Sequence, residues 1–140
     1  MSNWESIDLT KVSPTLELIK ENKEGYTYQL FAASYDPSNI NKAQVTAFVV
    51  DDGEFTGRRV YFSYPDPIEY PWAKNMFVRL AIAVGQDILP GEGPVAYVNR
   101  VAKSYARFKA PLLHRTYKDK NTGEDRETVD VDIKHPRPAA

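Results

Sequence analysis

Polar and hydrophobic residues alternate in the first half of the chain, which is the pattern of β-strands with one buried face. Glycine, aspartate and proline separate the alternating stretches, and these residues favour turns. The acidic segment 51–54 contains the Asp-Gly pair that is typical of a tight hairpin. The pattern therefore predicts a meander of three antiparallel strands, over residues 26–33, 44–50 and 57–64.

Near residue 71 the hydrophobic period lengthens from two to about 3.6 residues. Trp72, Met76 and Leu80 then fall on one helical face, which we interpret as a core-packing face. Pro71 suits the first turn of a helix, and Gly85 suits the position just after its end. The pattern predicts a helix over residues 72–84 and a second, weaker helix over 95–105.

From residue 107 onward the period returns to two, so Phe108 and Leu112 are expected on the buried side of a strand. Pro111 cannot donate to a strand ladder, which places it at an edge or a bulge. The pattern predicts a strand that starts near residue 107 and a last strand over 128–134, with a turn over 120–124 between them.

Three strands, a helical insert and two strands form the element order of a five-stranded OB-fold barrel. We therefore predict a mainly β fold: an OB barrel with a helical insertion between the third and fourth strands. The predicted organisation is an N-terminal arm (residues 1–24), one domain (25–135) and a short C-terminal tail (136–140).

Composition narrows the classes of function. The chain has 140 residues and no cysteine, which predicts a single domain without disulfides or thiolate chemistry. No apolar run reaches the roughly 20 residues of a membrane-spanning helix, and the first residues do not form a secretory signal. We therefore expect a cytoplasmic protein with no membrane contact, located in the host cytoplasm if a phage encodes it.

Candidate catalytic groups are few. The only histidines are His114 and His135, and no glycine-rich phosphate loop is present. Asp130 and Asp132 share one face of the predicted last strand, but no third ligand accompanies them, so a solvated strand face is the preferred interpretation. We expect a protein that is not an enzyme, with no catalytic residue, no cofactor and no metal site.

Positive charge is concentrated in residues 100–120, which contain seven Lys or Arg residues and one acid, although the whole chain has a net charge of −1. Tyr105, Phe108 and Tyr117 lie between these cations. Cations and aromatic rings together suit a single-stranded nucleic acid, which offers phosphates and unstacked bases. A solvated charged edge of a β protein is the alternative interpretation of the same pattern.

The chain resembles a family of phage and prophage single-stranded-DNA-binding proteins with OB folds, many of them described only as domains of unknown function. The resemblance spans residues 24–135 and depends on four segments: Glu-Gly-Tyr at 24–26, the strand–turn–strand segment 48–60, the helix end Ala-Val-Gly at 83–85, and the charged hairpin 117–124. The resemblance implies low-specificity single-stranded DNA binding in phage replication or recombination.

Alternation on the predicted strands selects the exposed side chains. An inward Val60 places Arg59 and Tyr61 outward, and the same alternation places Arg107 and Lys109 outward on another strand. A buried core position is the alternative for each tyrosine. The predicted nucleic-acid-binding residues are Arg59, Tyr61, Arg107, Lys109, Arg115, Tyr117, Lys118, Lys120, Tyr28 and Phe31.

Single-stranded DNA is thus the expected partner, with RNA as the alternative nucleic acid, because recognition of the 2′-hydroxyl leaves no short motif. Phage replication or recombination proteins are further expected partners, and an exposed edge near Pro111 would permit a homodimer. The alternative function is a non-enzymatic β-barrel module for protein interaction, in a phage virion or a replication complex, that docks its basic stretch on an acidic partner.

Overall fold

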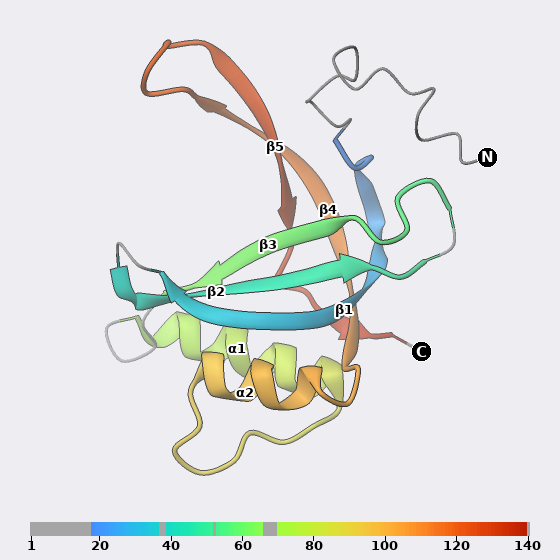
Figure 1. Cartoon of the computed structure of the whole chain (residues 1–140), viewed down its shortest axis with the longest axis vertical. Helices are drawn as coiled ribbons and strands as arrows, with labels where there is room; N and C mark the ends of the chain where they lie inside the picture. The colour runs from blue at the N-terminus through green and yellow to red at the C-terminus, as the bar shows by residue number, and fades with distance from the viewer. Residues whose placement is uncertain (1–17, 37–38, 52, 66–69, 140) are drawn as a thin grey trace, which may run out of the picture.

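The computed structural model describes residues 18–36, 39–51, 53–65 and 70–139 (Figure 1). The described chain is mainly β, with its helices between the third and fourth strands, as the sequence predicts. The elements are β1 (Asn22–Asp36), β2 (Asn39–Val49), β3 (Arg59–Tyr64), α1 (Pro71–Val84), α2 (Pro94–Ala102), β4 (Arg107–Lys118), β5 (Asp125–Val131) and β6 (Arg137–Pro138).

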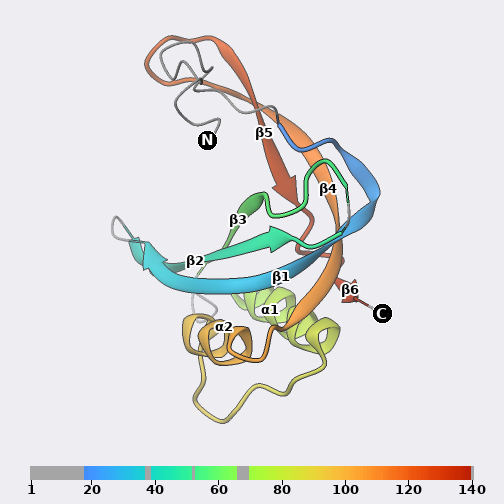
Figure 2. The ribbon, with the colours of Figure 1, turned by 45° about the vertical axis from the view of Figure 1, so that its right-hand side comes forward.

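The strands of the described residues form one antiparallel sheet in the order β3-β2-β1-β4-β5, with β6 paired beside β4. β1 is central, because it pairs with β2 on one side and with the first half of β4 on the other. The sheet curves strongly (Figure 2), and β3 comes near β5, but the described residues form no ladder between these two strands. The mainly β prediction is confirmed, and the sheet is open.

The helices cover one side of the sheet, where they lie next to each other (Figures 1 and 2). Helix α1 starts at Pro71 and ends before Gly85, whose left-handed conformation (φ 80°) lets its N–H bond to the carbonyl oxygen of Ala81. Both helix-boundary predictions are therefore confirmed. No helix in the described ranges is long and apolar enough to cross a membrane.

The core lies between the helices and one face of the sheet. Alternate residues of the strands point into it, as the period of two predicts, and so do the buried faces of α1 and α2. The largest fully buried side chains are Tyr28, Tyr64, Tyr97, Phe108, Leu30, Leu80, Leu112, Val45, Val49, Val60, Val98 and Val101.

β1 starts earlier than the sequence pattern predicts. Gly25 adopts φ +107°, and a Cβ at this position would lie 2.7 Å from the carbonyl oxygen of Ala110 on β4. Glycine therefore permits close approach of the two strands. The side chain of Asn22 accepts the N–H of Gly25 at 3.0 Å, and Ile19 is buried. Residues 18–24 of the predicted N-terminal arm thus belong to the fold, and residues 1–17 lie outside the described residues.

The second half of β4 and most of β5 form a two-stranded hairpin, residues 113–130, which we call the arm. The arm projects away from the helices and from β2 (Figures 1 and 2). At its tip, Asp119 accepts the backbone N–H of Asn121 at 2.8 Å. This hydrogen bond is the main reason that the pKa of Asp119 lies below its usual value. β6 lies within the segment predicted as a tail, and it pairs with β4.

Candidate nucleic-acid interface

The face of the sheet that points away from the core, which we call the outer face, has one row of side chains that crosses four strands. Gln29 on β1 lies opposite Arg107 on β4 and opposite Phe48 on β2, and Phe48 lies opposite Arg59 on β3. Directly opposed residues of antiparallel strands share a face. The row therefore has a cation at each end and spans about 14 Å, at about 4.8 Å per strand.

Aromatic rings fill the middle of this row. Strand alternation places Phe31 on the outer face, at a bulge in β1 between Leu30 and Ala32, and 53% of its surface is exposed. The ring centroids of Phe31 and Phe48 are 6.1 Å apart. The guanidinium carbon of Arg59 lies 5.4 Å from the centroid of Phe31, which is a cation–π contact. A cation and an exposed ring are thus held side by side.

Tyr61 extends this aromatic centre. It lies two residues after Arg59 on the same face, opposite Thr46, and is 65% exposed. At the other end of the row, the Nε atom of Arg107 donates to the side-chain oxygen of Gln29 at 3.0 Å. This bond orients the guanidinium and leaves its remaining donors for a ligand.

Five of the predicted binding residues are therefore close together on the outer face. The side chain of Lys109 is half-buried, and it lies on the side of β4 that also carries Arg107, opposite Thr27. The predicted residues that the outer face brings together are Phe31, Arg59, Tyr61, Arg107 and Lys109.

Tyr28 is the one predicted binding residue that the fold seals off. Its ring is fully buried and packs against Phe108, with centroids 5.4 Å apart. Burial also raises the pKa of its hydroxyl far above the usual value. The prediction that Tyr28 stacks on a base is wrong, because strand alternation places it in the core with Leu30.

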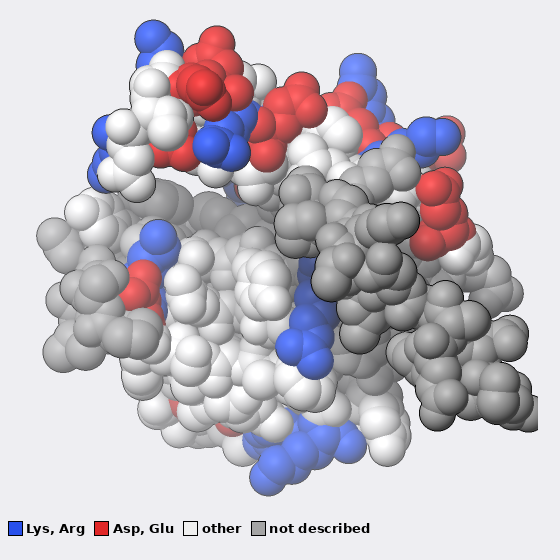
Figure 3. Space-filling view, turned by 45° about the horizontal axis from the view of Figure 1, so that its top comes forward, with Lys and Arg blue, Asp and Glu red and all other residues white. Residues whose placement is uncertain are grey.

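The remaining four predicted residues, Arg115, Tyr117, Lys118 and Lys120, lie on the arm or at its tip. The arm contains four Lys or Arg residues and five acids. Arg115 pairs with Asp130 at 2.6 Å, and Arg126 pairs with Asp119 at 2.7 Å. Acidic and basic side chains are accordingly mixed along the top of Figure 3. The arm is therefore no source of strong positive potential.

Arg100, at the start of the basic stretch, has a structural role. Its Nε atom lies 2.7 Å from Glu92, its Nη2 donates to the carbonyl oxygen of Asp87 at 2.7 Å, and its guanidinium covers the ring of Tyr97. The hydrogen bond from Arg100 is the main reason that the pKa of Glu92 lies below its usual value. Arg100 thus fastens the loop between the helices to α2.

The sequence does not predict two features of the structure, the backbone conformation of Tyr105 and the pairing of Arg137 with β4. Tyr105 is 71% exposed and has a left-handed backbone (φ 60°), although only glycine adopts that conformation easily. Arg137, in the predicted tail, lies directly opposite Lys109. The pairing of β6 with β4 has no sequence signal beyond a short, proline-flanked segment.

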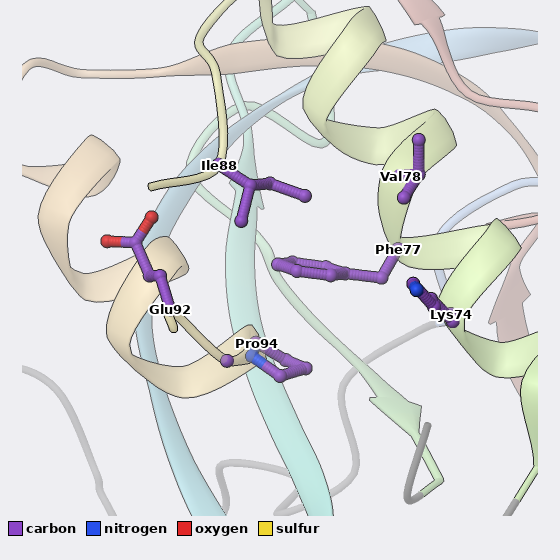
Figure 4. Close-up of a pocket in the computed structure, with 7 residues that line it drawn as sticks. Lys74, Phe77, Val78, Ile88, Glu92 and Pro94 are labelled. Atoms are coloured by element: carbon purple, nitrogen blue, oxygen red, sulfur yellow. The ribbon is translucent and has the colours of Figure 1, made fainter. Parts of the chain in front are cut away.

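A pocket of about 410 Å³ lies between α1 and the loop that leads into α2 (Figure 4). Phe77, Val78 and Ile88 give it apolar walls, and the charged side chains at its rim are Lys74 and Glu92. Glu92 is already bonded to Arg100, so the pocket lacks the converging polar groups of a catalytic site. In the described ranges, no group of three or more His, Cys, Asp or Glu residues could hold a metal ion.

Comparison of the chain with protein-family models, with curated proteins and with solved structures gives no match.

Proposed function

We propose that the protein binds single-stranded DNA with low sequence specificity, and that the outer face is its binding surface. The observation that carries the proposal is the row from Arg107 to Arg59, with Phe31 and Tyr61 exposed beside it. Guanidinium groups at both ends suit phosphates, and the rings between them suit unstacked bases. Aromatic faces accept any base, which explains why we expect little sequence preference.

We also propose that the sheet is of the OB type. An OB-type sheet would support single-stranded DNA binding. A three-stranded meander, helices and a hairpin follow one another, and the first strand pairs with both the second and the fourth. OB folds are partly open Greek-key barrels that bind oligonucleotides on the face of strands 2 and 3. Phe48 on β2, and Arg59 and Tyr61 on β3, lie on the outer face of these two strands, which is compatible with such binding. On the family resemblance alone, we extend the proposal to phage replication or recombination.

Binding of labelled oligo-dT and of duplex DNA of equal length, titrated at several salt concentrations, tests this function. We expect a preference for oligo-dT and a linear fall of log K with log salt, with a slope of about −0.7 for each phosphate neutralised. Arg59→Ala should make the slope shallower by about 0.7. Tyr61→Ala should weaken binding by about 1–3 kcal/mol at every salt concentration, because stacking does not depend on ion release.

Tyr70→Ala is the matched control for Tyr61→Ala. Tyr70 is 41% exposed, lies at the N-terminal end of α1 and contacts Trp72 there, away from the outer face. Its replacement should leave the affinity unchanged. Equal binding of duplex and single strand, or no binding of either, would contradict the proposed function.

A further inference from the structure

A strongly basic hollow lies where the start of β1, helix α1 and the segment around β6 meet. Its volume is about 590 Å³. The residues of the described chain that line it include no aspartate and no glutamate. Its basic lining residues are Lys23, Arg79, Lys134, His135 and Arg137.

Backbone contacts hold these side chains in place. Arg79 donates from Nη1 to the carbonyl oxygen of Lys134 at 3.3 Å, and Arg137 donates to the carbonyl oxygen of Glu24. Carbonyl oxygens orient a guanidinium without cancelling its charge. Among the described residues, the one carboxylate paired to this group is Asp132, which lies 2.9 Å from the Nδ1 atom of His135.

This concentration of charge is unusual for the chain as a whole. The net charge is −1, yet the fold brings four Lys or Arg residues together from distant parts of the sequence. Like charges that line one hollow repel each other, and an anion in the hollow relieves the repulsion. The hollow therefore suits an anionic ligand that can contact several cations at once, as a phosphate does.

The hollow also adjoins the outer face. Arg137 lies opposite Lys109 on β4, so the two side chains share a face, and Arg107 is on the same side of β4. Cations thus continue from the row on the outer face, through Lys109 and Arg137, to the hollow. We infer that the hollow binds backbone phosphates of the same DNA strand at the point where that strand leaves the aromatic centre. This inference depends on the proposed function.

The test uses the double variant Lys23→Ala/Lys134→Ala, because both side chains are exposed and neither makes a side-chain hydrogen bond within the described residues. The matched control is Lys74→Ala/Lys103→Ala, which removes the same charge from exposed positions outside the hollow. Each protein is titrated with labelled oligo-dT of about 4 and about 12 nucleotides, both within the range of about 4–16 nucleotides that one OB fold contacts.

We expect the double variant to bind the 4-nucleotide probe as the wild type does, since the short probe occupies only the outer face. With the 12-nucleotide probe, its Kd should rise about tenfold at low salt and its salt slope should become shallower by about 1.4, that is, by two phosphate contacts. The control should match the wild type in salt slope at both lengths.

The outcomes separate the two proposals. If the double variant and the control give the same Kd and slope with the long probe, the hollow makes no phosphate contact and the inference fails, while the proposed function stands. If the wild type binds neither probe, the proposed function fails, and the inference fails with it. An equal loss of affinity for both probe lengths would also overturn the inference, because the contact would then not lie beyond the outer face.

Discussion

The exposure of Phe31 follows from the same strand alternation that buries Tyr28. Tyr28 and Leu30 alternate into the core, as their spacing predicts. Phe31, one residue after Leu30, therefore points to the outer face, where it contacts Arg59, and the bulge reverses the alternation only for the residues that follow. The sequence does predict an exposed Arg59 and Tyr61. Strand alternation sets Tyr28 and Phe31 on opposite faces, but it does not by itself decide which of these faces is the core.

Two buried tyrosines differ in whether their hydroxyls are satisfied, which gives a prediction for stability. Tyr64 is buried, and its hydroxyl has no hydrogen-bond partner among the described residues. Tyr97 is equally buried, and its hydroxyl donates to the carbonyl oxygen of Gln86 at 2.7 Å. Burial raises the pKa of Tyr97 to about 12.

Tyr64→Phe should therefore raise the free energy of unfolding by about 1 kcal/mol, because it removes an unpaired buried hydroxyl. Tyr97→Phe is the matched control and should lower it by about 1 kcal/mol, because it leaves the carbonyl oxygen of Gln86 without its donor. Urea denaturation of the two variants measures both changes. A loss of stability in Tyr64→Phe as large as in Tyr97→Phe would contradict this explanation.

At the scale of elements, the arm shows why charge counted along the sequence differs from charge in space. Residues 100–120 are strongly basic when taken alone. Hairpin pairing then sets Arg115 beside Asp130, and the turn sets Asp119 beside Arg126. The sequence predicts both strands of the hairpin, but the cancellation depends on their register. The helices, by contrast, were predictable from Pro71 and Gly85 because helix ends have local signals.

The mixed charge of the arm leads to a prediction about binding. The double variant Arg115→Ala/Lys118→Ala should change the Kd for oligo-dT less than twofold at about 0.1 M salt, because acids of the arm already screen these cations. Arg59→Ala/Arg107→Ala is the comparison on the outer face and should weaken binding at least tenfold. Fluorescence anisotropy with one labelled oligonucleotide measures both. A larger effect from the arm than from the outer face would assign the binding surface to the arm.

At the scale of the whole molecule, strand order makes one surface from residues that are distant in sequence. The central position of β1 sets Gln29 between Phe48 and Arg107, and β6 adds Arg137 beside Lys109. The sequence predicts the order of strands and helices, since each has a clear period. It does not predict that the sheet stays open or that the basic hollow forms, because both depend on contacts between elements far apart in the chain.

Mapping of DNA contacts by NMR shows whether the outer face is the DNA-binding surface. In ¹⁵N–¹H spectra recorded while oligo-dT is added, we expect the largest amide shift changes along the row on the outer face, at Gln29, Phe48, Arg59 and their neighbours on β1 to β4. Amides around the apolar pocket at α1 and on the arm should change little. Shift changes confined to α1 or to the arm, with the outer face unaffected, would show that the outer face is not the binding surface.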